Sequence, residues 1–288
     1  MAVNSAHGLA FHRGLGTPLS PSSSSPYTKY LDADSIAEYA ASAYSKPMFS
    51  VVANGAEHSE LRKWVGEFFT EIPSSPAQTF SSEQSKYYGG EERIAHGSGN
   101  TMVLGFPGSS TFTGKFYKPE ISVLAALLGG QSSIKWSSGF SLLANAAKDY
   151  PNLHVATKSN IYSDAGLLTV MLHGSALDIR SAAKPVVDTL KSVASGISDE
   201  NFQKAKALAK FKELEFGQNT RAGMELTGLG LVQGGNAYQI DEVAKSMDGV
   251  TAEKVQQAAK EALEGKASVS TVGDLYMLPY AEEIGLKV

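Results

Sequence analysis

A stretch rich in proline and serine, at about one quarter of the chain, limits the fold more than any other feature. Residues 73–86 read Pro-Ser-Ser-Pro-Ala-Gln-Thr-Phe-Ser-Ser-Glu-Gln-Ser-Lys. This stretch has no apolar periodicity, and its two prolines disfavour both helix and strand. It therefore predicts a linker and a domain boundary, which divides the 288 residues into a short part, 1–72, and a longer part, 87–288.

Apolar periodicity predicts helices and strands in both parts. In the short part it predicts a helix at 34–45, a strand at 48–53 and a helix that carries Leu61, Trp64 and Phe68. In the longer part, the predicted strands are Tyr87–Tyr88, 93–95, 101–106, 154–161, 167–173 and 269–272. The predicted helices there are 119–128, 179–193, 198–217, 221–232, 240–247, 251–264 and a short one after Leu278.

The two parts share an order of elements, which indicates an internal duplication. Residues 50–56 and 268–274 both follow a helix, both read as a short strand, and both carry a glycine in the same place. These glycines, Gly55 and Gly273, lie 218 residues apart (273 − 55). We therefore expect a nearly complete second copy and only the last part of a first one. The isolated front part would leave a sheet edge unpaired, which predicts self-association.

Charge and composition argue against several classes of protein. The net charge is −4, and the one dense run of lysines is followed by Glu213 and Glu215 on a predicted helix, so it indicates a solvated face and no nucleic-acid partner. There is no cysteine, which excludes thiolate zinc sites, disulfides and cysteine nucleophiles. No apolar run reaches the roughly 18 residues that a membrane span needs.

Histidines do not form a recognisable metal motif. The segment from Asn54 to His58 has the spacing of an inverted zinc motif, H-x-x-E-H, but an asparagine replaces the first histidine and Gly55 interrupts the helix. His7 and His12 are five residues apart, not the four that two ligands on one helix face require. The remaining histidines lie on or beside predicted strands without a ligand pattern: His96, His154 and His173. We therefore predict no metal site.

Three further motifs are incomplete. Gly108 to Lys115 resembles a phosphate-binding loop, but the spacing is one residue too long and Phe116 stands where a magnesium ligand belongs. Gly228-Leu229-Gly230 begins a dinucleotide fingerprint that Gln233 breaks. Ser132-x-x-Lys135 lacks its companion motifs. We therefore predict no catalytic or cofactor-binding residue, which disfavours a stand-alone enzyme.

Four segments resemble one known family. They are 7–19 (H-G-L-A-F-H-R-G-L-G-T-P-L), 35–61, the hairpin 162–167 (Y-S-D-A-G-L) and 272–279 (V-G-D-L-Y-M-L-P). Their order and spacing are similar to those of the pitrilysin-like (M16) zinc peptidase superfamily. The resemblance implies α+β domains of the LuxS and processing-peptidase type, each a β-sheet with helices on one face. Residues 1–72 would be the end of a first domain and 87–288 a nearly complete second one.

Segment 127–143 narrows the resemblance. It is short and carries Lys135-Trp136, whereas the loop of processing-peptidase α subunits is longer and rich in glycine. It resembles that of the core proteins of the mitochondrial cytochrome bc1 complex (complex III). This implies a non-catalytic structural and assembly subunit on the matrix side of the inner membrane. It also implies binding to core protein 1 and other complex III subunits, without cofactors. The alternative is a non-catalytic or substrate-binding subunit of a mitochondrial processing peptidase.

Overall fold

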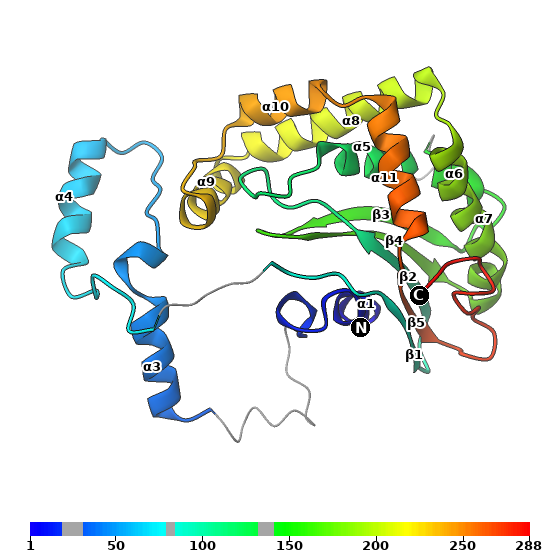
Figure 1. The fold of residues 1–288 in the computed structure, drawn as a ribbon, viewed down its shortest axis with the longest axis horizontal. Helices are drawn as coiled ribbons and strands as arrows, with labels where there is room; N and C mark the ends of the chain where they lie inside the picture. Colours follow the sequence, from blue (N-terminus) through cyan, green and yellow to red (C-terminus); the bar gives the residue numbers. More distant parts are fainter. Residues whose placement is uncertain (19–30, 79–83, 132–140) are drawn as a thin grey trace.

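A five-stranded β-sheet lies at the centre of the computed structural model, which describes residues 1–18, 31–78, 84–131 and 141–288 (Figure 1). The strand order is β1-β5-β2-β4-β3. β1 runs parallel to β5, and the other pairs are antiparallel. The strands are β1 (Gly90–Ala95), β2 (Asn100–Pro107), β3 (His154–Ile161), β4 (Gly166–Gly174) and β5 (Ser268–Gly273).

The central strands are apolar on both faces, so both faces of the sheet are covered. Met102, Leu104 and Phe106 of β2 belong to the large core, whereas Val103 lies between them in sequence and belongs to a separate cluster. Because successive side chains of a strand point to opposite faces, this division shows two packed layers. All six residues of β5 are buried.

Helices of the longer part cover one face of this sheet (Figure 1). Serine and threonine caps start them as the sequence predicts: Ser198 accepts a hydrogen bond from the amide of Asn201, and Thr251 from that of Lys254. The expected sheet with the helices of this part on one face is confirmed. The helices are α5 (Pro119–Leu128), α6 (Leu142–Ala146), α7 (Ala176–Ser195), α8 (Asp199–Gln218), α9 (Thr220–Gly234), α10 (Ile240–Asp248) and α11 (Ala252–Glu264).

One further helix, α1 (Ala2–Phe11), lies on the opposite face of the sheet, where the sequence did not predict one. Ala2 and Ala6 pack with Val103 and Val272 in a small cluster. The small alanine side chains let the helix approach the strands closely. The contact is partly polar, because the Oγ of Ser270 lies 2.7 Å from the Oγ of Ser5. A 3₁₀ turn, η1 (Gly14–Gly16), follows α1.

The segment between α1 and the sheet forms two helices, α3 (Ala33–Ala43) and α4 (His58–Phe68), joined through the 3₁₀ turn η2 (Lys46–Met48). Both lie to one side of the sheet and its helices (Figure 1), and Ser42 is the only buried residue of the two helices. The predicted strand at 48–53 is wrong, because no described strand pairs with it. The predicted division at 73–86 stays a prediction, and residues 79–83 lie outside the described ones.

Two other local predictions were wrong. Tyr87 and Tyr88 do not form the predicted strand, because β1 starts only at Gly90. The amide of Tyr88 donates instead to the carbonyl of Ala10. The expected helix after Leu278 is a series of turns. Arg93 holds these turns, because its guanidinium donates to the carbonyls of Leu275, Leu278 and Pro279 at 2.8–2.9 Å.

Candidate functional site

Five histidines of the sequence-based metal search have structural partners. His7 Nε2 lies 2.7 Å from the Tyr162 hydroxyl, and the ring of His12 stacks on Tyr88 with 4.0 Å between centroids. His154 and His173 face each other across β3 and β4, but they bond to different partners, Gln131 and Thr101. His96 Nδ1 lies 3.0 Å from the carbonyl oxygen of Ser98.

The inverted-zinc-like segment does not form a metal site either. Glu57 precedes α4 and His58 is its first residue, while Asn54 lies in the turn before it. In the part of the chain that the structure describes, no three His, Asp or Glu side chains gather where they could hold a metal ion. Ser132 and Lys135 lie outside the described residues, as does most of the segment 127–143 that narrows the family resemblance.

The loop that resembles a phosphate-binding loop follows β2 and forms the floor of a polar cleft. Its backbone is fixed: the amide of Thr111 donates to Tyr162 O at 2.8 Å, and the amide of Gly114 to Thr111 O at 2.8 Å. A Cβ on Gly114 would lie 2.5 Å from the carbonyl oxygen of Ser163, so only glycine fits there. The loop does not lead directly into a helix and therefore is no P-loop.

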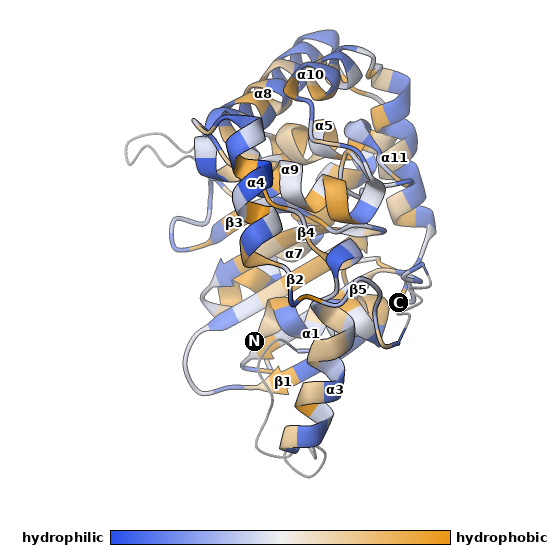
Figure 2. Cartoon of the chain, turned by 90° about the vertical axis from the view of Figure 1, so that its left-hand side faces the viewer, coloured by the Kyte–Doolittle hydropathy of each residue, from blue (hydrophilic) through white to orange (hydrophobic). Residues whose placement is uncertain are grey.

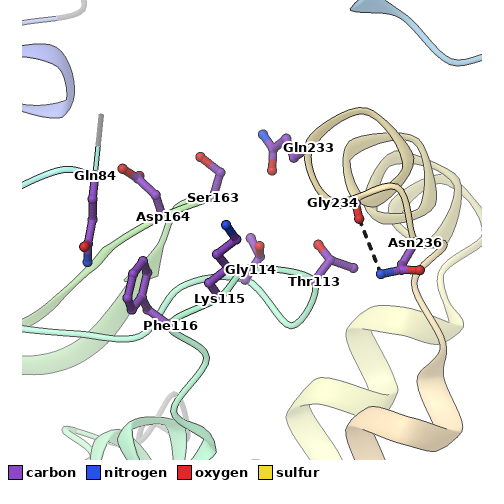
Figure 3. A pocket seen from close by; sticks show the side chains of 11 residues that line it. Gln84, Thr113, Gly114, Lys115, Phe116, Ser163, Asp164, Gln233, Gly234 and Asn236 are labelled. Carbon is purple, nitrogen blue, oxygen red and sulfur yellow. Dashed lines mark hydrogen bonds between the residues drawn. The ribbon is translucent and has the colours of Figure 1, made fainter. Parts of the chain in front are cut away.

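The cleft has a volume of about 700 Å³ and lies between this loop, the β3–β4 turn and the end of α9 (Figure 3). Lys115 extends into its middle, toward Ser163 and Gln233. Among the described residues no carboxylate forms an ion pair with Lys115. Asp164, the acidic residue that lines the cleft, instead accepts a hydrogen bond of 2.7 Å from the amide of Ser85. The cleft thus holds one cationic group, Lys115, among hydroxyls, amides and the carboxylate of Asp164.

An apolar pocket of about 330 Å³ adjoins this cleft, and Thr111, Thr113 and Gln233 line both. Its walls come from the loop after β2, the end of β3, and helices α8, α9 and α10. The apolar wall residues are Phe112, Ile161, Phe216, Leu226, Leu229 and Val243. These residues come from separate segments and share no sequence motif, so the sequence analysis did not predict this pocket.

Burial changes the titration of three wall residues. It raises the pKa of Tyr117 to about 12, against a weaker opposing effect of its 3.1 Å hydrogen bond with Ser246. It also raises the pKa of Tyr238 and that of Glu213, whose carboxylate accepts a weak hydrogen bond of 3.5 Å from Ser122. Because desolvation penalises the charged form, the pocket disfavours negative charge near Glu213.

Helices α3 and α4 offer a second kind of candidate site, an exposed apolar surface. Trp64 and Phe68 stack at 5.8 Å between centroids, yet Phe68 remains 75 % exposed. Figure 2 shows hydrophobic and hydrophilic residues alternating along both helices. An amphipathic helix without a buried face normally packs against another surface. We call Leu31, Ile36, Tyr44, Trp64, Phe68 and Phe69 the α3–α4 apolar surface.

The sequence of this chain matches a known protein family. Residues 30–208 match the model of a family described as "Peptidase M16 inactive domain". The chain belongs to this family. The resemblance to the M16 superfamily is therefore confirmed, and so is the expectation of an inactive member.

Curated relatives of this M16 chain include respiratory and processing subunits. It is 45 % identical over 289 residues to "Cytochrome b-c1 complex subunit 2, mitochondrial" of Neurospora crassa, which covers 100 % of the chain and 63 % of the relative. The protein of the same name from Cryptococcus neoformans is 32 % identical, over 99 % of the chain and 64 % of the relative. A probable mitochondrial-processing peptidase subunit alpha-1 of Arabidopsis thaliana is 22 % identical, over 99 % and 57 %.

A solved structure shares the fold. The chain superposes with a TM-score of 0.79 on a chain from "Complex III2 from Candida albicans, Inz-5 bound", at 15 % identity, over 98 % of this chain and 69 % of that one. Because the match covers 98 % of this chain, the shared fold includes α1, α3 and α4 as well as the sheet. Among the residues that the structure describes, none of the helices combines the length and apolarity required to cross a bilayer.

Proposed function

We propose that this chain serves as a structural and assembly subunit of mitochondrial respiratory complex III, as core protein 2 of that complex, and has no catalytic function. The observation that carries the proposal is the 45 % identity to the Neurospora crassa complex III subunit along the whole chain. Since the chain spans 63 % of that relative, the function of the whole protein is inferred from this shared part. Core protein 1 and other complex III subunits are the partners we propose.

The α3–α4 apolar surface supports an assembly role. It exposes large aromatic side chains such as Phe68. Exposed apolar patches of this kind usually mark a surface that a partner protein covers. Aromatic residues are also enriched where binding energy concentrates in interfaces. We propose that this surface and residues 1–72 belong to a first M16-like domain, and that 87–288 forms the second. The subunit would then lie on the matrix side of the inner membrane.

The alternative function is a non-catalytic or substrate-binding subunit of a mitochondrial processing peptidase. The 22 % identity to the Arabidopsis thaliana alpha-1 subunit favours it, because that similarity also extends over 99 % of the chain. The identity is half of that to the Neurospora crassa complex III subunit. For this reason the complex III function is the better supported one.

Affinity capture distinguishes the two functions. The tagged chain is incubated with solubilised fungal mitochondria, and the retained proteins are quantified by mass spectrometry. We expect core protein 1 and other complex III subunits at comparable amounts. A double variant with Phe68→Ser and Trp64→Ser removes the two stacked rings of the α3–α4 apolar surface. It should lower the recovery of these partners about tenfold.

Two outcomes would contradict the complex III function, and a third would contradict the role of the α3–α4 apolar surface. Recovery of the processing-peptidase partner without complex III subunits would favour the alternative. Equal recovery by the wild type and the double variant would remove the α3–α4 apolar surface from the interface. Zinc-dependent cleavage of a presequence peptide by the purified chain would show a catalytic function that its family membership argues against.

A further inference from the structure

The polar cleft and the apolar pocket form two halves of one continuous candidate ligand site. They adjoin through Thr111, Thr113 and Gln233, which line both. The apolar half alone has about 330 Å³, which lies within the roughly 300–1,000 Å³ that small-molecule sites usually have. A largely apolar pocket beside a few convergent polar groups is the usual composition of such sites.

The polar half provides one positive charge for an anionic head group. Lys115 points into the cleft with no ion-pair partner among the described residues, and Ser163 and Gln233 both lie beyond the end of its side chain (Figure 3). Hydrogen bonds between an ammonium and an oxyanion are about twice as strong as neutral ones. A carboxylate at this position would therefore be held by Lys115 and neutral donors.

The walls are fixed before any ligand arrives. The close approach of Gly114 to Ser163 O connects the loop to the β3–β4 turn, and a Cβ on Gly234 would lie 2.8 Å from the carbonyl oxygen of Thr113. These contacts hold the loop against both the sheet and α9. A preformed site loses less conformational entropy on binding, which favours affinity.

Two hydroxyl groups in the wall of the apolar pocket have no hydrogen-bond partner in the described part of the chain. They are Thr111 Oγ1 and Tyr238 OH, and both are buried. A buried hydroxyl without a partner costs stability, and native structures contain few such groups. Their position in this wall, at and near the junction with the cleft, marks the pocket as a place where a polar ligand atom would be stabilised.

An acidic wall residue limits the charge of the ligand. Asp164 lines the cleft, so a second negative charge on the ligand head group would be repelled there, whereas Glu213 in the pocket is accompanied by Lys212. We propose that this composite site binds an amphiphilic monocarboxylate of the fatty-acid class, with its carboxylate at Lys115 and its apolar body against Leu226 and Leu229.

Titration calorimetry with decanoate, decanol and decyl phosphate tests the site on the full chain. Lys115→Met should weaken decanoate binding about tenfold, because a charge-assisted hydrogen bond is lost, and should leave decanol binding within about twofold. Leu229→Trp fills the mouth of the apolar pocket and should weaken both ligands about tenfold. Decyl phosphate, which carries more negative charge, should bind more weakly than decanoate.

Matched controls separate the site from general surface binding. Lys148→Met removes an exposed lysine that lies outside both walls, and Leu231→Trp adds the same ring to α9 at a position that does not line the pocket. Neither should change decanoate affinity by more than about twofold. Equal effects of Leu229→Trp and Leu231→Trp, the absence of saturable binding, or decyl phosphate binding as tight as that of decanoate would overturn the proposal.

Discussion

At the residue scale, Arg93 shows how one side chain fixes a segment that lacks secondary structure. Its guanidinium donates to three carbonyls of the turns after β5 and stacks on Tyr280 at 3.8 Å from the ring centroid. Glu91 lies 3.8 Å away and balances its charge. Planar guanidinium geometry satisfies several carbonyls at once, which a lysine cannot do. The sequence-based prediction of a terminal helix was wrong because this tertiary contact could not be read from local periodicity.

Arg93→Lys should therefore destabilise the chain by about 1–3 kcal/mol, because at least one buried carbonyl loses its donor. Urea unfolding followed by circular dichroism measures this change. Arg221→Lys is the matched control, since Arg221 is exposed and forms only an ion pair within α9 with Glu225. An Arg93→Lys variant as stable as the control would show that the turns do not depend on the guanidinium.

Two buried tyrosines predict a loss of stability in alkaline solution. Burial raises the pKa of both Tyr87 and Tyr117 from 10.0 to about 12. Because the pKa of these tyrosines is higher in the folded state, the unfolded state releases their protons at a lower pH than the folded state does. The stabilisation is complete below pH 10, and it decreases as the pH rises from 10 to 12.

Thermal unfolding between pH 9 and pH 12 tests this dependence. Tyr117→Phe and Tyr87→Phe should each flatten the fall in melting temperature above pH 10. The first also loses the hydrogen bond with Ser246 Oγ, and the second loses the bond that Tyr87 donates to Gly105 O and the one that it accepts from Ser268 Oγ. Tyr276→Phe is the control, because Tyr276 is almost fully exposed. A slope that none of the substitutions changes would contradict the assignment to these two tyrosines.

At the element scale, the sequence predicted most helices and strands because their periodicity is strong and local. The capped starts at Ser198 and Thr251 and the hairpin of β3 and β4 could be found from short motifs. The false strand at 48–53 shows the limit of such reasoning. A strand is stabilised by a partner, and none of the described strands pairs with this segment.

The position of α1 could not be predicted from its sequence. Its apolar face consists mainly of alanines, which indicate a helix but not the surface that it covers. The sheet provides that surface through Val103 and Val272. The composite ligand site was missed for a related reason, since Lys115, Thr111 and Tyr238 come from separate segments and share no sequence motif.

Ala6→Leu should test the contact of α1 with the sheet. Ala6 is fully buried there, so the larger side chain should destabilise the chain by about 1–3 kcal/mol or release α1. Hydrogen exchange of the Val103 and Val272 amides reports which of the two occurs. Asn4→Leu places the same side chain on the exposed side of α1 and should have little effect. Equal exchange in both variants would contradict the packing.

At the scale of the whole molecule, the described residues form two unlike regions. The sheet, α1 and the helices from α5 to α11 bury a large core, whereas α3 and α4 bury almost nothing and expose aromatic side chains. An assembly subunit requires such a surface, and an M16 inactive domain with this surface fits the proposed place in complex III.

Substitution of the α3–α4 apolar surface should separate assembly from folding. Phe68→Ser should lower the affinity for a partner by at least about tenfold and change the melting temperature by less than about 3 °C, because Phe68 contributes little to the core. Phe211→Ser removes another exposed ring, from α8, and serves as the control. A large loss of melting temperature in Phe68→Ser would show that this residue stabilises the fold instead.

The most direct test of the central claim is native mass spectrometry of the chain mixed with equal amounts of core protein 1 and the processing-peptidase β subunit. The complex III function predicts a one-to-one complex with core protein 1, which Phe68→Ser weakens and Phe211→Ser does not. A complex with the processing-peptidase subunit alone, or no complex with either protein, would contradict the claim that this chain is a complex III assembly subunit.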